Sequence, residues 1–300
     1  MINKHALVDK FSLAATALIT GRKKYFSARL EAHSFEEHFH KIDMRVPELM
    51  QEGEYELTVH TFSGDVYPAI KMVQWLGFDY PTIIYHHGDN ERPFDFSEGA
   101  KNTFYQIFMR WPRRIPANLI LVRAPYHHGK LKPFLDKMTE LNHFMTMIAV
   151  PVRITEWIIR QFRRRSQADI LVTGLSLGGW VTNLHRAYFN SSQAYIPIMA
   201  GAKLDEVFLS SSYKLLSGKL ARENPAVIKE KLSFFTRFRS VTTSNLYPLL
   251  ARHDQYVDYY VQKPAYNGFP LRTIDTGHIT GTLKPYLSRE HILEVLQMHS

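Results

Sequence analysis

The stretch ADILVTGLSLGGW, residues 168–180, decides the fold because it joins a strand pattern to a helix pattern through glycines. Its first part is an apolar run rich in β-branched residues, and the residues from Leu177 onward have the apolar spacing of a helix. Ser176 lies at the junction, inside the pattern GLSLG. Gly174 and Gly178 fit a sharp strand-to-helix turn, where larger side chains would collide with the neighbouring strand and helix. The pattern therefore predicts that Ser176 lies in a strained strand-to-helix turn.

The composition of the chain is typical of one large α/β domain. With 300 residues, 45% of them hydrophobic, the chain can form a substantial core. It contains no cysteine, which excludes disulfides, thiolate metal ligands and a cysteine nucleophile. No apolar run in the sequence reaches the roughly 20 residues that a membrane-spanning helix requires. We therefore expect a soluble, cytoplasmic protein.

The chain is basic, with a formal net charge of +9 and clusters of Lys and Arg at residues 22–24, 110–114 and 160–165. Anionic lipids, anionic substrates and nucleic acids all offer groups that such side chains neutralise. The third cluster ends a helical pattern, where cations complement the carbonyl end of the helix. Because no nucleic-acid-binding motif accompanies the clusters, we expect no nucleic-acid partner and retain peripheral contact with an anionic membrane surface as a hypothesis.

Short β-branched runs alternate with helical patterns from about residue 55, which indicates a mostly parallel sheet with helices on both faces. The first two runs are expected to pair as an antiparallel edge hairpin around Ser63, Gly64 and Asp65, which favour a turn. The remaining six are expected to be parallel. The predicted strands are 55–62, 68–76, 82–88, 118–126, 169–176, 194–201, 245–254 and 271–278.

The helical patterns indicate that the chain has two parts. Residues 1–50 are expected to form an N-terminal helical extension packed on the core, and residues 51–300 the main domain. Residues 203–243 form a long excursion between two strands, which we interpret as a helical lid over the carboxyl ends of the strands, where ligands bind in open α/β sheets. The other predicted helices are 96–111, 131–165, 178–190, 257–263 and 284–298.

With Ser176 placed at a strand-to-helix turn, the chain resembles the α/β-hydrolase superfamily of serine esterases and lipases, over roughly residues 55–298. The stretch TIIYHHGDNERPF is similar to the histidine-glycine loop of that family at His87 and Gly88. The resemblance implies an oxyanion hole formed by the backbone N–H of Leu177 and by that of Gly88 or Asp89.

Two further stretches carry the resemblance. In LRTIDTGHITG, His278 follows the last predicted strand, as the catalytic histidine of the family does. In NLYPLLARHDQYVD, Asp254 is our choice for the catalytic acid, and Asp258 is the alternative, because it lies one helical turn further on and could belong to the next helix. The chain order Ser176, Asp254, His278 is the order of this family.

The resemblance implies a serine hydrolase that cleaves a small-molecule carboxylic ester or other acyl substrate through an acyl-enzyme, with no cofactor. Ser176 would be the nucleophile, His278 the base and Asp254 the group that orients it. The alternatives are a thioesterase, amidase or peptidase of the same fold, or a non-catalytic binding protein, since one fold serves many functions.

Three further side chains, His87, His127 and Trp180, are predicted by their positions to line the substrate pocket. The pairs His86-His87 and His127-His128 also raise a metal hypothesis, because imidazole is a common zinc ligand. Adjacent residues of an extended segment point to opposite sides, so each pair offers at most one inward ligand. We therefore expect no metal site.

Overall fold

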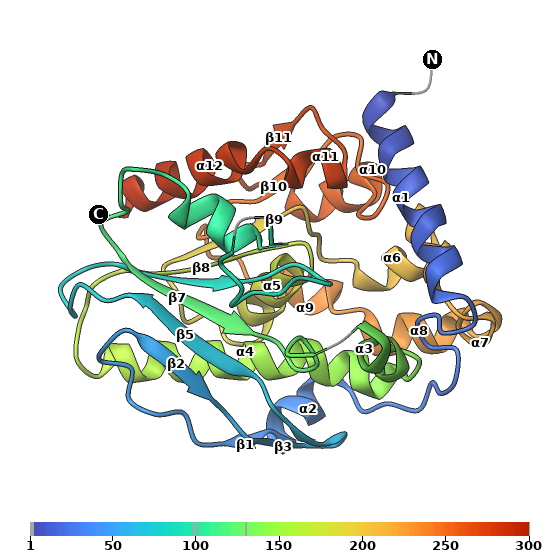
Figure 1. The fold of residues 1–300 in the computed structure, drawn as a ribbon, viewed down its shortest axis with the longest axis horizontal. Helices are drawn as coiled ribbons and strands as arrows, with labels where there is room; N and C mark the ends of the chain where they lie inside the picture. The colour runs from blue at the N-terminus through green and yellow to red at the C-terminus, as the bar shows by residue number, and fades with distance from the viewer. Residues whose placement is uncertain (1–2, 98, 101, 130, 300) are drawn as a thin grey trace.

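The computed structural model describes residues 3–97, 99–100, 102–129 and 131–299, and an eight-stranded sheet with helices on both faces lies at its centre (Figure 1). The strand order is β11-β10-β9-β8-β6-β7-β5-β2. Strands β6 to β11 pair in parallel, and β5 and β2 extend the sheet antiparallel. The predicted α/β fold class is confirmed. The strands are β2 Gly53–Glu56, β5 Ala69–Gln74, β6 Thr82–His86, β7 Asn118–Arg123, β8 Ile170–Leu175, β9 Ala194–Ile198, β10 Leu249–Ala251 and β11 Arg272–Ile274.

The antiparallel edge differs from the prediction. Residues 55–62 do not form one strand: β2 pairs with β5, whereas β3 (Val59–Thr61) forms a hairpin with β4 (Gly64–Val66). The predicted turn around Ser63 therefore exists, but it belongs to a separate three-stranded sheet with β1 (Asp43–Met44). The break follows from Pro68, whose carbonyl accepts the Leu57 N–H at 3.0 Å but which has no N–H to continue the ladder.

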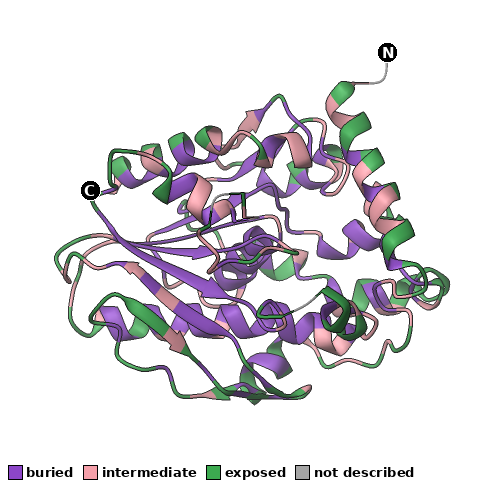
Figure 2. Ribbon diagram, viewed as in Figure 1, coloured by how far each residue is buried: buried purple, intermediate pink, exposed green. Residues whose placement is uncertain are grey.

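Helices cover both faces of the sheet. The long α4 (Leu141–Arg163) and α5 (Leu177–Tyr188) pack on one face, and α12 (Pro285–Met298) and the π-helix η1 (Tyr105–Met109) pack on the other. Buried side chains alternate between the faces along each strand, so that Ile84 belongs to the first core and Ile83 to the second. Figure 2 shows that the central strands are buried along their length.

Two predicted helices are shorter than expected. Of the predicted helix 96–111, residues 98 and 101 lie outside the described residues, and η1 forms the regular part. The predicted helix 131–165 divides into α3 (Leu131–Met138) and α4. The division has a local cause, because the carbonyl of Thr139 accepts the N–H of Ala28 at 3.0 Å and Glu140 bridges to Arg29, so both residues pair with the N-terminal segment.

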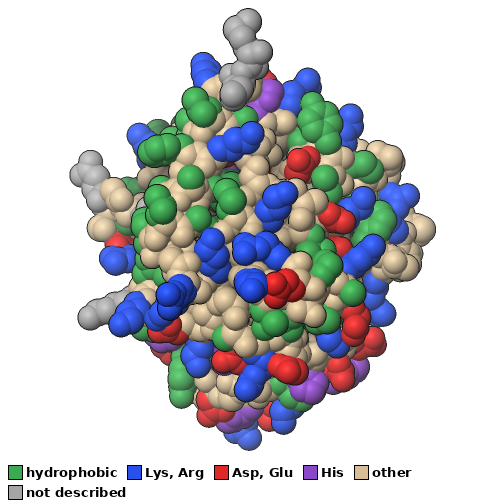
Figure 3. Space-filling view, turned by 90° about the vertical axis from the view of Figure 1, so that its right-hand side faces the viewer, with side chains coloured by type: hydrophobic (Ala, Val, Ile, Leu, Met, Phe, Trp, Pro, Cys, Tyr) green, Lys and Arg blue, Asp and Glu red, His purple; other side chains and the backbone are tan. Residues whose placement is uncertain are grey.

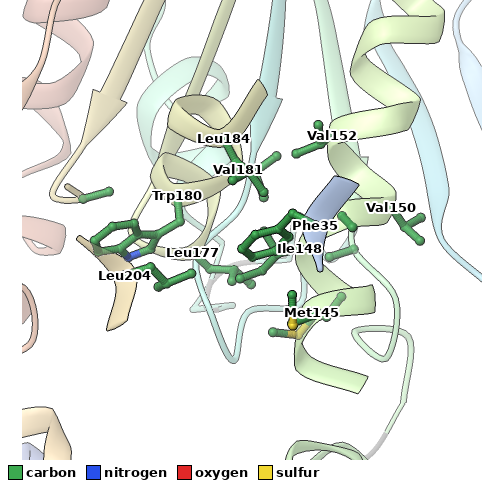
Figure 4. Close-up of a cluster of buried hydrophobic side chains, with 14 of the residues drawn as sticks. Phe35, Met145, Ile148, Val150, Val152, Leu177, Trp180, Val181, Leu184 and Leu204 are labelled. Carbon is green, nitrogen blue, oxygen red and sulfur yellow. The ribbon is translucent and has the colours of Figure 1, made fainter. Parts of the chain in front are cut away.

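Helix α5 contributes the centre of the larger core (Figure 4). Trp180 is 4% exposed and packs beside Leu204, while Leu177 lies near Ile148 of α4 and Phe35 of α2 (Phe35–Lys41). This packing fixes the helix that follows Ser176. The predicted pocket residue Trp180 is therefore a core side chain in this structure.

The N-terminal and inserted segments lie around the end of the sheet that carries the site. Helix α1 (Lys4–Thr20) packs against α11 (His278–Thr282) and the 3₁₀ helix η2 (Ser212–Leu216), whereas α2 packs on α4. The remaining short helices are α6 Leu204–Leu209, α7 Lys219–Glu223, α8 Pro225–Leu232, α9 Phe235–Ser240, α10 Tyr259–Gln262 and η3 Lys263–Tyr266. Among the helices formed by the described residues, none is both long and apolar enough to cross a membrane.

We expect Gly178→Ala to lower the free energy of unfolding by about 1–3 kcal/mol, because its Cβ would lie 2.0 Å from the carbonyl oxygen of His86 and the backbone would have to move. Urea denaturation followed by circular dichroism measures the loss. Gly129→Ala is the matched control, since a Cβ there meets no atom within 4 Å. Equal stability of the two variants would contradict the close packing of α5 on β6.

Candidate active site

Ser176 lies in a strained turn between β8 and α5. Its backbone has φ 54° and ψ −112°, a left-handed conformation that a residue with a side chain seldom adopts. The turn is held by the Ser176 N–H, which donates to the carbonyl of Ile198 at 2.9 Å. It is also closely packed, since a Cβ at Gly174 would lie 2.5 Å from the Gly178 backbone. This is the strained strand-to-helix turn that the sequence pattern predicted.

The side chains of Ser176, His278 and Asp254 form one chain of hydrogen bonds, although the sequence separates them widely. The Nε2 atom of His278 lies 3.0 Å from Ser176 Oγ, and its Nδ1 atom lies 2.7 Å from Asp254 Oδ2. An ionised carboxylate only accepts, so Nδ1–H donates to Asp254 and the lone pair of Nε2 faces the serine hydroxyl. His278 is 5% exposed and Asp254 is 3% exposed. The arrangement can take a proton from the serine.

The structure separates the two candidate acids. Asp254 follows β10, and its second oxygen, Oδ1, accepts the backbone N–H groups of Tyr256 and Val257 at 2.8 Å each. Asp258 is instead the N-cap of α10, where Oδ1 accepts the N–H of Tyr260 at 2.9 Å and that of Val261 at 3.2 Å. Only Asp254 lies against the histidine; Asp258 stabilises the start of a short helix.

A third carboxylate, which sequence analysis did not place at the site, comes from α1. Asp9 is fully buried, and its Oδ2 accepts the backbone N–H of His278 at 2.7 Å and that of Gln255 at 3.1 Å. Its Oδ1 accepts the N–H of Ile279 at 3.0 Å. Asp9 therefore ties together the loops that carry His278 and Asp254. The only signal in the sequence was an aspartate that interrupts an apolar helical pattern.

Charge and burial act in opposite directions on His278. Burial alone would lower the pKa of its imidazole, but the charge of Asp254, the hydrogen bond to that carboxylate and the charge of Asp9 together raise the pKa above the ordinary value of 6.5. Tyr256 completes the surroundings: its ring stacks on the imidazole with centroids 4.6 Å apart, and its hydroxyl donates to Ser12 Oγ of α1 at 2.8 Å. Helix α1 thus positions His278 through two contacts: Asp9 binds its backbone, and Ser12 binds Tyr256, which stacks on its ring.

The predicted oxyanion donors differ in their availability. The N–H of Leu177 belongs to the first turn of α5, where N–H groups have no partner inside the helix. The N–H of Gly88 donates to Glu91 Oε1 at 2.9 Å and is therefore already engaged. Asp89 has a backbone N–H with no hydrogen-bond partner in the described part of the chain. Of the two alternatives in this loop, the structure leaves Asp89 free to donate.

The histidine predicted to line the pocket at position 87 is internal. His87 is 2% exposed; its Nε2 accepts the N–H of Ala124 at 3.0 Å, and its Nδ1–H donates to the carbonyl of Gly88 at 2.7 Å. Burial lowers the pKa of His87 well below the ordinary value, with a smaller contribution from His127. Both nitrogens support the loop, so they are not free to contact a substrate.

His127, by contrast, lies beside a cavity of 420 Å³ next to the oxyanion loop. Arg92, Phe94 and Arg123 also line this cavity. The Nε2 of His127 lies 3.5 Å from Asp89 Oδ1. Across the described ranges, no three His, Asp or Glu side chains are grouped so that they could hold a metal ion.

Comparisons with known proteins find similarity at the level of structure. No family model and no curated protein matches the chain. The Pyrococcus horikoshii acylaminoacyl peptidase is similar with a TM-score of 0.55 and 13% identity, over 84% of this chain and 42% of that one. A prolyl endopeptidase is similar with a TM-score of 0.56 and 14% identity, over 85% and 40%. The Pyrococcus furiosus esterase Pf2001 is similar with a TM-score of 0.53 and 15% identity, over 86% and 98%. The chain thus spans about two fifths of the length of the two peptidases.

We expect Asp9→Asn to lower the pKa of His278, because the negative charge of Asp9 favours the protonated imidazole. Titration of the ¹³C-labelled histidine side chains by NMR measures the shift, with His278→Ala identifying the resonance. Asp275→Asn is the control, since Asp275 is an exposed acid near the same loop and hydrogen-bonds to His253. An unchanged or higher pKa in Asp9→Asn would contradict the proposed influence of Asp9.

Proposed function

We propose that this chain, which has the α/β-hydrolase fold of the structures it resembles, is a serine hydrolase that cleaves carboxylic esters. The observation that carries the proposal is the hydrogen-bonded chain from Ser176 through His278 to Asp254, with distances of 3.0 Å and 2.7 Å. A strained serine, a buried histidine and a buried carboxylate in this order have the geometry of nucleophilic catalysis.

The first half of the reaction forms an acyl-enzyme. The Nε2 atom of His278 removes the proton of Ser176 as Oγ attacks the ester carbonyl carbon, and Asp254 stabilises the imidazolium that results. The N–H groups of Leu177 and Asp89 are proposed to donate to the oxyanion, each contributing roughly 3 kcal/mol of transition-state stabilisation. The tetrahedral intermediate then collapses, and His278 returns its proton to the departing alkoxide.

The second half releases the acid. Water attacks the acyl carbonyl while His278 accepts its proton, and Ser176 recovers its own proton when the carboxylic acid leaves. Because His278 must be neutral to act as the base, the rate is expected to rise with pH through the pKa of His278, which lies above its ordinary value. The chain's own residues supply each of these proton transfers.

The comparisons support an ester over an amide as the substrate. The chain covers 98% of the Pyrococcus furiosus esterase but only 42% of the acylaminoacyl peptidase, so the shared part is nearly a whole esterase and a minor part of a peptidase. Thioesters and amides have the same carbonyl chemistry and are the alternatives within this fold. A panel of ester, thioester and anilide substrates with one acyl group separates them.

A fluorophosphonate probe tests the proposal directly, because it reacts with serines that a working base and oxyanion hole activate. We expect a single adduct on Ser176, identified by intact mass and peptide mapping. The adduct should be absent in Ser176→Ala and at least about 10³-fold slower to form in His278→Ala. An unlabelled, correctly folded wild-type protein would contradict the proposal and favour a non-catalytic binding protein.

The two candidate acids provide a second test. We expect Asp254→Asn to lower kcat for ester hydrolysis by about 10⁴-fold, because an amide at this position no longer holds the reactive tautomer of His278. Asp258→Asn should keep kcat within about threefold of the wild type, since its carboxylate caps α10 and does not contact His278. Steady-state kinetics of both variants on one soluble ester give the comparison, and similar losses in both would argue against Asp254 as the catalytic acid.

A further inference from the structure

Helix α1 buries polar side chains and exposes large apolar ones. A helix on the surface of a protein ordinarily buries its apolar stripe and exposes its polar face. In α1 the residues directed at the protein include Asp9, which is fully buried, Thr20, which is 9% exposed, and the half-buried Ser12, together with Leu13. Apart from Leu13, the large apolar side chains of α1 lie on the other side. Such a face requires an explanation other than packing within this chain.

The outward face of α1 is a continuous apolar stripe. Leu7, Phe11 and Leu18 recur at helical spacing and are 56%, 76% and 83% exposed. Ile19, which is 72% exposed, and Val8, which is 41% exposed, widen the stripe. Figure 2 shows exposed residues recurring along α1, and Figure 3 views the side of the molecule on which α1 lies. We call these five residues the apolar face of α1.

The charged side chains of the segment that carries the apolar face are nearly all positive. Between residues 3 and 24 the sequence has Lys4, Lys10, Arg22, Lys23 and Lys24, and Asp9 is its only acid. That acid is buried beneath the helix. Lys4, Lys10 and Arg22 are exposed and form no ion pair within the described residues, whereas Lys23 is half-buried and pairs with Asp136. In Figure 3, blue Lys and Arg side chains lie close to hydrophobic ones on this side of the molecule. Exposed apolar side chains flanked by cations are features that allow a helix to bind at a membrane interface.

We propose that the apolar face of α1 binds the surface of an anionic lipid bilayer, with the helix lying in the plane of the interface. At 17 residues α1 is shorter than a membrane span, which fits a helix that lies on the bilayer and does not cross it. The apolar side chains enter the boundary between headgroups and acyl chains, and the flanking cations contact anionic headgroups.

A second copy of this chain fits the apolar face less well. A two-fold contact places the same patch on both partners, so the exposed cations of one α1 would meet those of the other. The only carboxylate of the segment faces inward and is already bonded to three backbone N–H groups. Charge complementarity therefore favours an anionic partner.

The position of α1 connects the bilayer to the candidate active site. Asp9 lies directly opposite the apolar face and binds the backbone of His278, and Ser12 binds Tyr256, which stacks on the same histidine. A bilayer that touches α1 therefore lies one helix away from the triad. If the proposed function holds, the substrates are amphiphilic esters that reside in or partition into that surface.

Vesicle sedimentation with the full chain tests the binding independently of catalysis. The probes are vesicles of phosphatidylcholine alone and of phosphatidylcholine with phosphatidylglycerol, and the proteins are the wild type and Ser176→Ala. We expect both proteins to partition at least about tenfold more strongly to the anionic vesicles and to be released by high salt, which screens exposed charges. Failure to bind anionic vesicles, or equal binding to both vesicles, would overturn the proposal.

The apolar contribution is tested with the double variant Phe11→Ser and Leu18→Ser, which we expect to lower partitioning to anionic vesicles at least about tenfold. The control is Tyr67→Ser with Met298→Ser, because these side chains are 50% and 67% exposed but lie outside α1. Circular dichroism establishes that each variant is folded. Equal binding of the two double variants, or a stable dimer in sedimentation equilibrium that the α1 variant abolishes, would overturn the proposal.

Ester turnover separates this inference from the proposed function. With a soluble short-chain ester, Phe11→Ser with Leu18→Ser should have the kcat and KM of the wild type. With an ester embedded in anionic vesicles, the same variant should have a KM at least about tenfold higher. Vesicle binding without turnover of either ester would support the proposed lipid-binding face and contradict the proposed hydrolase activity. Turnover of the soluble ester without vesicle binding would support the hydrolase activity and contradict the lipid-binding face.

Discussion

The close contact between α5 and β6 is the constraint on which the rest of the site depends. A Cβ at Gly178 would lie 2.0 Å from the carbonyl oxygen of His86, so no larger residue fits where the helix begins. This contact permits the sharp turn after β8, in which Ser176 has φ 54° and its N–H donates to the carbonyl of Ile198. Because β6 and β8 are adjacent, the loop after β6 that carries Asp89 comes beside the same helix terminus. One steric condition thus allows Ser176 and the proposed oxyanion donors to lie together.

Around that turn, buried carboxylates bind the backbone N–H groups of the loops. Asp254, Asp9 and Glu91 each accept backbone N–H groups of a loop near the site. A buried carboxylate is costly unless it is hydrogen-bonded, and these three are. The loops they bind therefore have few alternative conformations of similar free energy. The result is a site whose geometry is set before a substrate arrives, which is the condition for electrostatic stabilisation of a transition state.

The sequence predicted the elements of the fold that depend on local pattern. The six parallel strands and the turn at Ser176 follow from apolar runs and glycines, and Asp254 and His278 lie three and four residues after their strands. Their catalytic roles remain a proposal. What local pattern could not show is the contact of Asp9 with His278, because it joins residues 269 apart. It also could not show that Glu91 accepts the hydrogen bond of the Gly88 N–H or that Trp180 packs in the core, since both depend on side-chain positions in three dimensions.

The bonds between Asp9 and the backbone near His278 also link the candidate active site to the order of synthesis. The ribosome makes α1 before residues 255, 278 and 279, whose N–H groups Asp9 binds. Long-range contacts of this kind form slowly and late in folding. Until these contacts form, the strands and the turn at Ser176 can fold, but Asp9 does not yet hold the backbone of His278. The candidate active site is therefore assembled as one of the last events of folding, after most of the chain has emerged.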